Sequence, residues 1–209
     1  MKLTQQTTNR IAQFLPNAQT NSRTTHGKGF EYYIADKHGL PAHDQYKGKI
    51  DFPKEIVAQG NVADDLIADW ELKYYNIKTS TLILGDVMRK IECLDKGMVL
   101  VLGLYDRTPE KLVDVLYIKL DSAKAKLTRK IVKLLKEASE YVKNRDNDLD
   151  DTREFVKEIN AQLSSTPFLL TNTSANPRFS ESKGKWIDET RSISISIPMK
   201  KLLEMYVNA

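Results

Sequence analysis

The sequence predicts an α/β fold, in the broader sense α+β, with a mixed central β-sheet flanked by helices. Short apolar or β-branched runs bounded by Gly, Asp, Asn or Pro follow one another through the middle of the chain, and such runs are typical of strands. Segments with apolar residues three and four positions apart, typical of amphipathic helices, lie before, between and after them. With 209 residues, 41% of them hydrophobic, residues 1–209 are expected to form one domain with a substantial core.

The composition restricts the compartment and the kinds of site that the chain can build. Its single cysteine, Cys93, excludes an internal disulfide framework and a multi-cysteine zinc site, and it favours a reducing cytoplasm. No apolar run approaches the roughly 18 residues of a membrane span, and the first residues lack the core of a signal peptide. We therefore expect a cytoplasmic protein without a membrane partner. The net charge of +4 is only mildly basic and does not by itself indicate a nucleic-acid partner.

Helices are predicted at the start of the chain. A weak apolar pattern in residues 11–15 indicates a short helix before Pro16. Phe30, Tyr33 and Ile34 have helical spacing and predict a second helix from about Gly29 to residues 38–39, where a glycine can end it.

Four strands are predicted in the central part of the chain, followed by two helices. The strands are expected at residues 66–75, 79–84, 98–105 and 113–120, with a short helix at residues 86–94. Apolar residues at helical spacing predict a longer helix over residues 122–143, and a further helix over residues 152–163 would complete a helical hairpin. Lysine and arginine fill the other side of the longer helix. A solvated face is the more common meaning of such a pattern, and contact with phosphate is the alternative.

The C-terminal part of the chain begins with a polar region at residues 171–191, predicted to be a long loop. Side chains of this kind can reach base edges or phosphates, although an ordinary surface loop has the same composition. The candidate DNA-binding residues there are Asn172, Asn176, Arg178, Lys183 and Lys185. Alternating Ser and Ile at residues 192–197 predict a half-buried strand, and residues 199–206 predict a closing helix.

A candidate catalytic site lies in the run from Asp65 to Tyr75. In a strand, Glu71 and Lys73 project to one face while Leu72 projects to the other, so a carboxylate and an ammonium group stand side by side. Hydrolysis of a phosphodiester needs a metal ion and a group that serves the attacking water. Mg²⁺ prefers oxygen ligands, so Asp65 and Glu71 are the expected ligands and Lys73 the residue at the water. A harmless ion pair on the solvent face is the structural alternative.

Three segments of the chain resemble the PD-(D/E)xK nuclease superfamily. Asp65 with Glu71-Leu72-Lys73 resembles its core motif, in which an acid precedes an acid-x-Lys triplet. Residues 27–34, Gly-Lys-Gly-Phe-Glu-Tyr-Tyr-Ile, resemble the helix upstream of that motif in restriction endonucleases related to MutH, such as MvaI and BcnI. Gly184-Lys185, the alternating strand and residues 199–204 are similar to the strand and helix that close those enzymes.

The resemblance implies a restriction-endonuclease-like core and a Mg²⁺-dependent type II restriction endonuclease that cuts double-stranded DNA to leave 5′-phosphate ends. Carried over by position, Glu31 would be a helix-borne acid that supports the metal site. Asp65 and Glu71 would hold the metal, and Lys73 would act at the nucleophile. Lys28, in the same motif as Glu31, would contact DNA.

Several alternatives stay open at this point. The usual Pro-Asp of the motif is replaced by Ala63-Asp64-Asp65, so either aspartate is a candidate ligand, and Asp69 lies near enough to compete. A nicking or mismatch-repair endonuclease of the same fold, or a non-catalytic DNA-binding protein, is compatible with the same motif. The sequence decides neither the recognition site nor whether the protein acts as a monomer or a homodimer.

Overall fold

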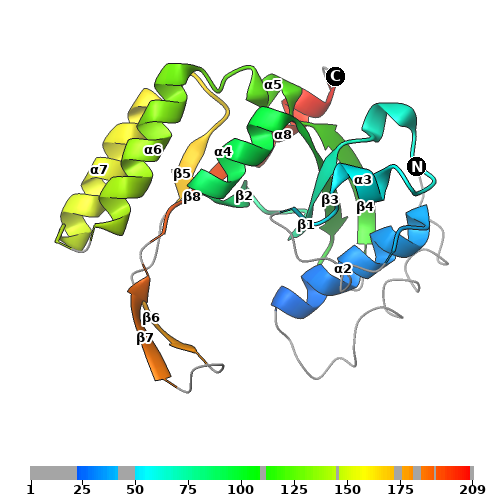
Figure 1. The fold of residues 1–209 in the computed structure, drawn as a ribbon, viewed down its shortest axis with the longest axis horizontal. Coiled ribbons are helices and arrows are strands. Elements are labelled where there is room, and N and C mark those ends of the chain that lie inside the picture. Colours follow the sequence, from blue (N-terminus) through cyan, green and yellow to red (C-terminus); the bar gives the residue numbers. More distant parts are fainter. Residues whose placement is uncertain are drawn as a thin grey trace. The chain divides into compact units, whose positions relative to one another are not determined.

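A computed structural model describes residues 23–41, 50–108, 112–144, 146–171, 176–180, 185–190 and 192–207. The chain divides into two compact units (Figure 1). Unit 1 consists of residues 1–79, 96–121 and 208–209, and unit 2 consists of residues 80–95 and 122–207. The predicted helix at residues 11–15 lies outside the described residues.

Unit 1 contains a three-stranded sheet in the order β1-β3-β4. Strand β1 (Asp69–Asn76) pairs in parallel with β3 (Met98–Tyr105), which pairs antiparallel with β4 (Leu112–Lys119). The sheet is therefore mixed, as predicted, and all three strands begin or end within a few residues of the predicted bounds. Strand β3 is the central strand, and its consecutive buried residues show that both of its faces are covered along most of its length.

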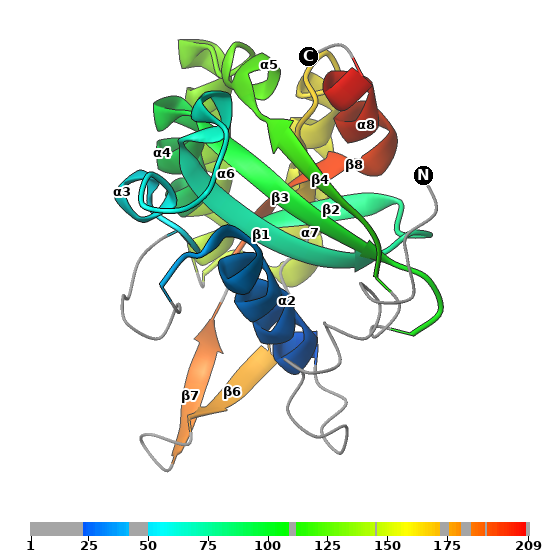
Figure 2. The same ribbon diagram turned by 90° about the vertical axis from the view of Figure 1, so that its right-hand side faces the viewer.

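Helix α2 (Arg23–His38) lies against one face of this sheet (Figure 2). Phe30 and Ile34 of the helix and Trp70 and Leu72 of β1 belong to one buried hydrophobic cluster. The helix ends at the predicted place, where Gly39 takes a positive φ of 64° that a glycine adopts without strain. The short helices α3 (Lys54–Val57) and η2 (Asp64–Leu66), which the sequence did not indicate, precede β1.

Unit 2 contains an antiparallel sheet in the order β2-β8-β5. The strands are β2 (Thr81–Asp86), β8 (Ser194–Pro198) and β5 (Leu169–Thr171). Strand β2 was expected to share a sheet with the other three predicted strands, and it pairs instead with β8, more than a hundred residues further along the chain. Ser196 of β8 is buried like its isoleucine neighbours, and its hydroxyl lies 2.6 Å from that of Thr171.

The helices of unit 2 include a helical hairpin, as predicted. Helix α6 (Arg129–Lys143) and helix α7 (Leu149–Gln162) run side by side (Figure 1), and the rings of Tyr141 and Phe155 stack with centroids 4.1 Å apart. The predicted continuous helix over residues 122–143 is interrupted after the short helix α5 (Asp121–Lys124), because Thr128 takes an extended conformation and caps α6 by accepting a hydrogen bond from the Ile131 N–H.

Helix α4 (Val87–Lys96) follows β2, and α8 (Met199–Val207) closes the described chain. Among the described residues, no helix combines the length and apolarity that crossing a membrane requires. Part of the predicted polar loop is a hairpin of β6 (Asn176–Ser180) and β7 (Lys185–Thr190). Phe179 pairs with Trp186 there, and aromatic residues favour strands, so this part of the loop prediction was wrong.

Candidate active site

Glu71 and Lys73 lie side by side on β1, as the alternation of a strand predicts. Lys73 Nζ is 2.8 Å from Glu71 Oε1. The Glu71 side chain is only 3% exposed and that of Lys73 is 23% exposed, so this is no solvated surface pair. A buried carboxylate with one cationic neighbour retains strong electrostatic interactions, because little water screens it.

Asp51, which the sequence motif did not indicate, is held against the same part of β1. Its Oδ2 accepts a hydrogen bond of 2.7 Å from the backbone N–H of Leu72, the residue between Glu71 and Lys73. The neighbouring Phe52 fixes this register, because its N–H and C=O both bond to the backbone of Trp70, at 3.0 and 2.7 Å. The signal that could have revealed Asp51 is the pattern Ile50-Asp51-Phe52, an acid between two buried apolar residues in an extended segment.

Glu31 on α2 belongs to the same electrostatic cluster. Burial, helped by the negative charges of Asp51 and, less strongly, Glu71, raises the pKa of Glu31 to about 7, although Lys28 and Lys73 oppose this rise. Helix α2 holds Glu31 in place, since its neighbour Phe30 is buried against Tyr74 of β1 with ring centroids 5.0 Å apart. We call Glu31, Asp51, Glu71 and Lys73 the acidic cluster below.

Asp65, the predicted metal ligand, lies elsewhere in unit 1. It is exposed in η2, and its Oδ2 accepts a hydrogen bond of 2.8 Å from Lys119 Nζ, which also lowers the pKa of Asp65. Together with Asp69 it lines a cleft of about 450 Å³. Asp69 Oδ1 accepts a hydrogen bond from the Lys54 N–H at 2.8 Å, and Asp64 is exposed in the same turn as Asp65. The structure thus brings Asp51, and not Asp65, into contact with the Glu71–Lys73 segment.

The acidic cluster has the donor chemistry of a magnesium site. Among the described residues, no three His, Cys, Asp or Glu side chains are already arranged to hold a metal ion. Mg²⁺ commonly uses only one or two carboxylates and keeps several waters, so Asp51 and Glu71 suffice in number and type. Burial is the main cause of the raised pKa of Glu31, and a divalent cation would offset the smaller part that comes from the negative charges of Asp51 and Glu71.

The candidate DNA-binding residues are only partly within the described structure. Lys28 is an exposed residue of α2. Arg178 lies in β6, where its backbone pairs with Ile187, and Asn176 and Lys185 begin the two strands of the hairpin. Asn172 and Lys183 lie outside the described residues.

Comparisons of the chain with models of known protein families, with curated proteins and with solved structures gave no match. Function is therefore inferred from the side chains themselves. Two carboxylates and a lysine on adjacent backbone segments, with a partly buried glutamate beside them, can bind a hard cation and position a water molecule next to it.

Proposed function

We propose that this protein is a Mg²⁺-dependent endonuclease that hydrolyses phosphodiester bonds of double-stranded DNA, with a restriction-endonuclease-like core of the PD-(D/E)xK type. The observation that carries the proposal is the hydrogen bond from Leu72 N–H to Asp51, which holds a second carboxylate beside Glu71 and Lys73. The sequence resemblance around Glu31 and Glu71-Leu72-Lys73 supports the same reaction. Asp51 takes the place in the motif that the sequence had suggested for Asp65.

The roles of the side chains follow from their positions. Mg²⁺, when bound, would polarise the phosphoryl oxygen and offset the charge that develops there. Asp51 and Glu71 would be its protein ligands. The ammonium group of Lys73 would orient the attacking water and, as a nearby positive charge, stabilise the transition state. Glu31 would support the ligands electrostatically from α2. The expected products carry a 5′-phosphate and a 3′-hydroxyl.

Sequence choice would come from the region 171–191, which contains the β6–β7 hairpin. A two-stranded ribbon fits the major groove of duplex DNA. Asn pairs well with adenine there, and Arg or Lys with guanine, so Asn176, Arg178 and Lys185 would be base-reading candidates. This part of the proposal corresponds to a type II restriction endonuclease.

The test is incubation of purified protein with several long plasmid and phage DNAs, in Mg²⁺ or in EDTA. Discrete fragments that need Mg²⁺ and that disappear in the Glu71→Gln variant would establish a site-specific endonuclease. The matched control is Asp65→Asn, which also removes one carboxylate charge and should keep the activity. Intact DNA with every divalent ion and every DNA tested would refute the proposal.

A non-catalytic DNA-binding protein of the same fold is the second candidate. The absence of three preassembled metal-ligating side chains among the described residues favours it. It predicts DNA binding that needs no metal, without cleavage under any divalent ion. A nicking endonuclease would instead convert supercoiled plasmid to open circles and stop there. Whether one or both DNA strands are cut therefore distinguishes it from a restriction enzyme.

A further inference from the structure

A cluster of positive charge lies in unit 2, between α5 and the middle of α6. Between Ser122 and Lys136 the chain has six basic residues and no acidic residue. We call this stretch the basic segment; its charged residues are Lys124, Lys126, Arg129, Lys130, Lys133 and Lys136. All six are exposed.

The first four charges of the basic segment are free to meet a partner. Their side chains, those of Lys124, Lys126, Arg129 and Lys130, form no hydrogen bond or ion pair with any residue that the structure describes. The backbone beneath them is well anchored, because Ala123 and Ile131 are buried. The four cations are therefore presented to solvent from an ordered surface.

Helix stability does not explain this arrangement. Positive charges in the first turn of a helix oppose the helix dipole, and α6 has no acid there. Helix α7 of the same unit follows the ordinary rule, with Asp150 and Asp151 in its first turn. Its cations are also paired: Arg153 contacts Asp150 at 2.7 Å and Lys157 contacts Glu154 at 2.8 Å. Helix α7 thus has acids in its first turn and α6 has bases there, and this difference indicates that the charges of α6 serve a function.

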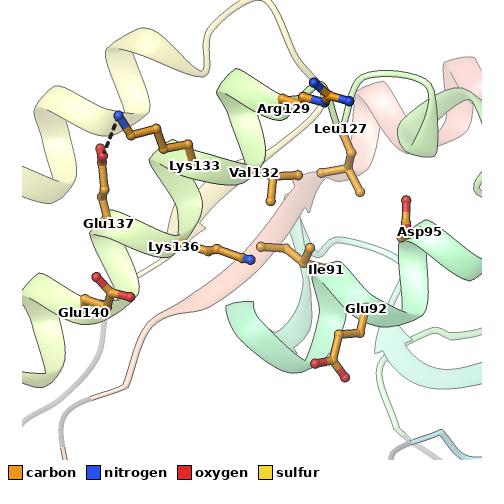
Figure 3. A pocket seen from close by; sticks show the side chains of 10 residues that line it. All are labelled: Ile91, Glu92, Asp95, Leu127, Arg129, Val132, Lys133, Lys136, Glu137 and Glu140. Carbon is orange, nitrogen blue, oxygen red and sulfur yellow. Dashed lines mark ion pairs between the residues drawn. The ribbon is translucent and has the colours of Figure 1, made fainter.

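The cleft beside α6 is not the positive surface. This cleft, of about 690 Å³, lies between α4 and α6 (Figure 3). Arg129, Lys133 and Lys136 border it, but so do four acids, Glu92, Asp95, Glu137 and Glu140. Lys133 pairs with Glu137 at 3.5 Å (Figure 3), one turn along the helix from Arg129. The unbalanced charge thus lies before α6 and in its first turn.

The surface fits a polyanion and not a membrane. An amphipathic helix binds a bilayer by inserting its apolar face. The apolar face of α6 is already used, because Ile131, Leu135 and Val142 are buried in the protein. What remains is a set of exposed cations, and such a set matches the closely spaced phosphates of a nucleic-acid backbone.

We propose that Lys124, Lys126, Arg129 and Lys130 bind the sugar–phosphate backbone of duplex DNA and supply sequence-independent affinity. The inference rests on the proposed function in that duplex DNA is taken to be the substrate. It assigns these four residues to binding only, and the acidic cluster alone to the chemistry.

The test measures binding of a fluorescent duplex in EDTA, where no cleavage occurs, at several salt concentrations. The variant is Arg129→Gln with Lys130→Gln, and the control is Arg153→Gln with Lys157→Gln, which removes the same two charges from α7. Each lost phosphate contact should lower the slope of log K against log salt by about 0.9, so loss of two should weaken binding roughly 60-fold at about 0.1 M salt. The control should bind nearly as the wild type does. Lys124→Gln with Lys126→Gln should act like the first variant.

A salt slope in both variants of the basic segment equal to that of the α7 control would overturn the inference. So would wild-type protein that binds vesicles rich in phosphatidylserine but no duplex. Circular dichroism checks folding, and the variant Arg129→Gln with Lys130→Gln should melt at or above the wild-type temperature because it removes charges that oppose the dipole of α6. If the wild type binds with a steep salt slope but never cleaves, the proposed nuclease function fails and this inference stands. If the wild type cleaves and both variants of the basic segment keep the wild-type salt slope, only this inference fails.

Discussion

The Asp51 carboxylate accepts a 2.7 Å hydrogen bond from the backbone N–H of Leu72, and this single contact ties an acid from a separate segment to the backbone between Glu71 and Lys73. Because the donor is a backbone group in the middle of β1, the position of Asp51 depends little on side-chain rotamers. The same contact keeps a donor of the β1 backbone satisfied. It therefore serves both the fold and the proposed site.

Asp51→Asn should abolish metal-dependent cleavage, whereas Asp65→Asn should leave it nearly intact. The asparagine keeps an oxygen that can accept from Leu72 N–H, so the fold should survive, but it lacks the charge that a Mg²⁺ ligand supplies. We expect a loss of roughly 100-fold or more in rate, the size of effect that follows removal of a preorganised electrostatic group. Rates on a plasmid substrate measure it. Equal losses of cleavage rate in both variants would show that Asp51 is not the metal ligand proposed here.

Lys73→Met should destabilise the metal-free protein as well as inactivate it. The change leaves the Glu71 carboxylate, 3% exposed, without its cationic neighbour. Breaking a fully buried pair costs 3–5 kcal/mol, and since Lys73 is 23% exposed we expect about 2 kcal/mol. Urea unfolding in EDTA measures this. The double variant Glu71→Gln with Lys73→Met should recover part of the loss, and a double variant less stable than Lys73→Met would contradict the assignment.

Stabilisation by Mg²⁺ should grow with pH through Glu31. Its pKa is raised from 4.5 to about 7, so between these values the folded protein holds a proton that the unfolded chain has lost. The free energy of unfolding should therefore fall as pH rises from about 4.5 to 7. A divalent cation would relieve the repulsion and raise the melting temperature more at pH 7.5 than at pH 5.5. In Glu31→Gln, Mg²⁺ should raise the melting temperature equally at both pH values. An equal rise at both pH values in the wild type would contradict a metal site at the acidic cluster.

The local elements were predictable from the sequence because they depend on nearby residues. Strand β3 matches its predicted bounds, and α2 and α8 end close to where capping and periodicity place them. The partner of β2 was not predictable, because pairing with β8 joins segments separated by more than a hundred residues and both read locally as ordinary strands. The break before α6 ends at Thr128, its N-cap, which capping chemistry could have indicated.

The candidate site was predictable only where it follows strand alternation. Glu71 and Lys73 are two positions apart, so their pairing follows from geometry. Asp51 is twenty residues before Glu71, and α3 and η2 lie between them. No local sequence pattern indicates that this segment brings Asp51 back to β1. Asp65 was the nearer acid in sequence, but η2 turns it toward Lys119. Short spacing along a chain with turns is thus a poor measure of distance.

His38 should make the protein less stable in mild acid. Its Nδ1–H donates to the Asn61 carbonyl at 3.1 Å, and Nε2 lies 2.6 Å from the Tyr117 hydroxyl. Burial, together with the nearby charge of Lys37, lowers the pKa of His38 below 6.5 although the Asn61 contact opposes this. The unfolded chain therefore binds the proton first, and the free energy of unfolding should fall as pH drops below about 6.5. The difference between wild type and His38→Gln, measured by urea unfolding from pH 5 to 8, isolates this effect from that of Glu31.

Gly103→Ala should destabilise unit 1 and disturb the site together. A Cβ at Gly103 would lie 2.5 Å from Phe30 Cε2 and 2.7 Å from Tyr74 Cδ2, inside the aromatic contact that holds α2 to β1. Overpacking of this kind costs about 1–3 kcal/mol, and displacement of Phe30 would also move the adjacent Glu31.

The matched control is Gly27→Ala in α2, where nothing beyond the local helix backbone lies within 4 Å of the added Cβ. It should be neutral or stabilise the protein by up to about 1 kcal/mol, because alanine favours the helix. The thermal unfolding temperature and the rate of Mg²⁺-dependent cleavage should both fall in Gly103→Ala and not in Gly27→Ala. Combining it with Phe30→Leu should restore part of the stability, because the smaller side chain makes room for the Cβ. If stability falls while cleavage per folded molecule stays at the wild-type level, the packing of Phe30 does not position Glu31.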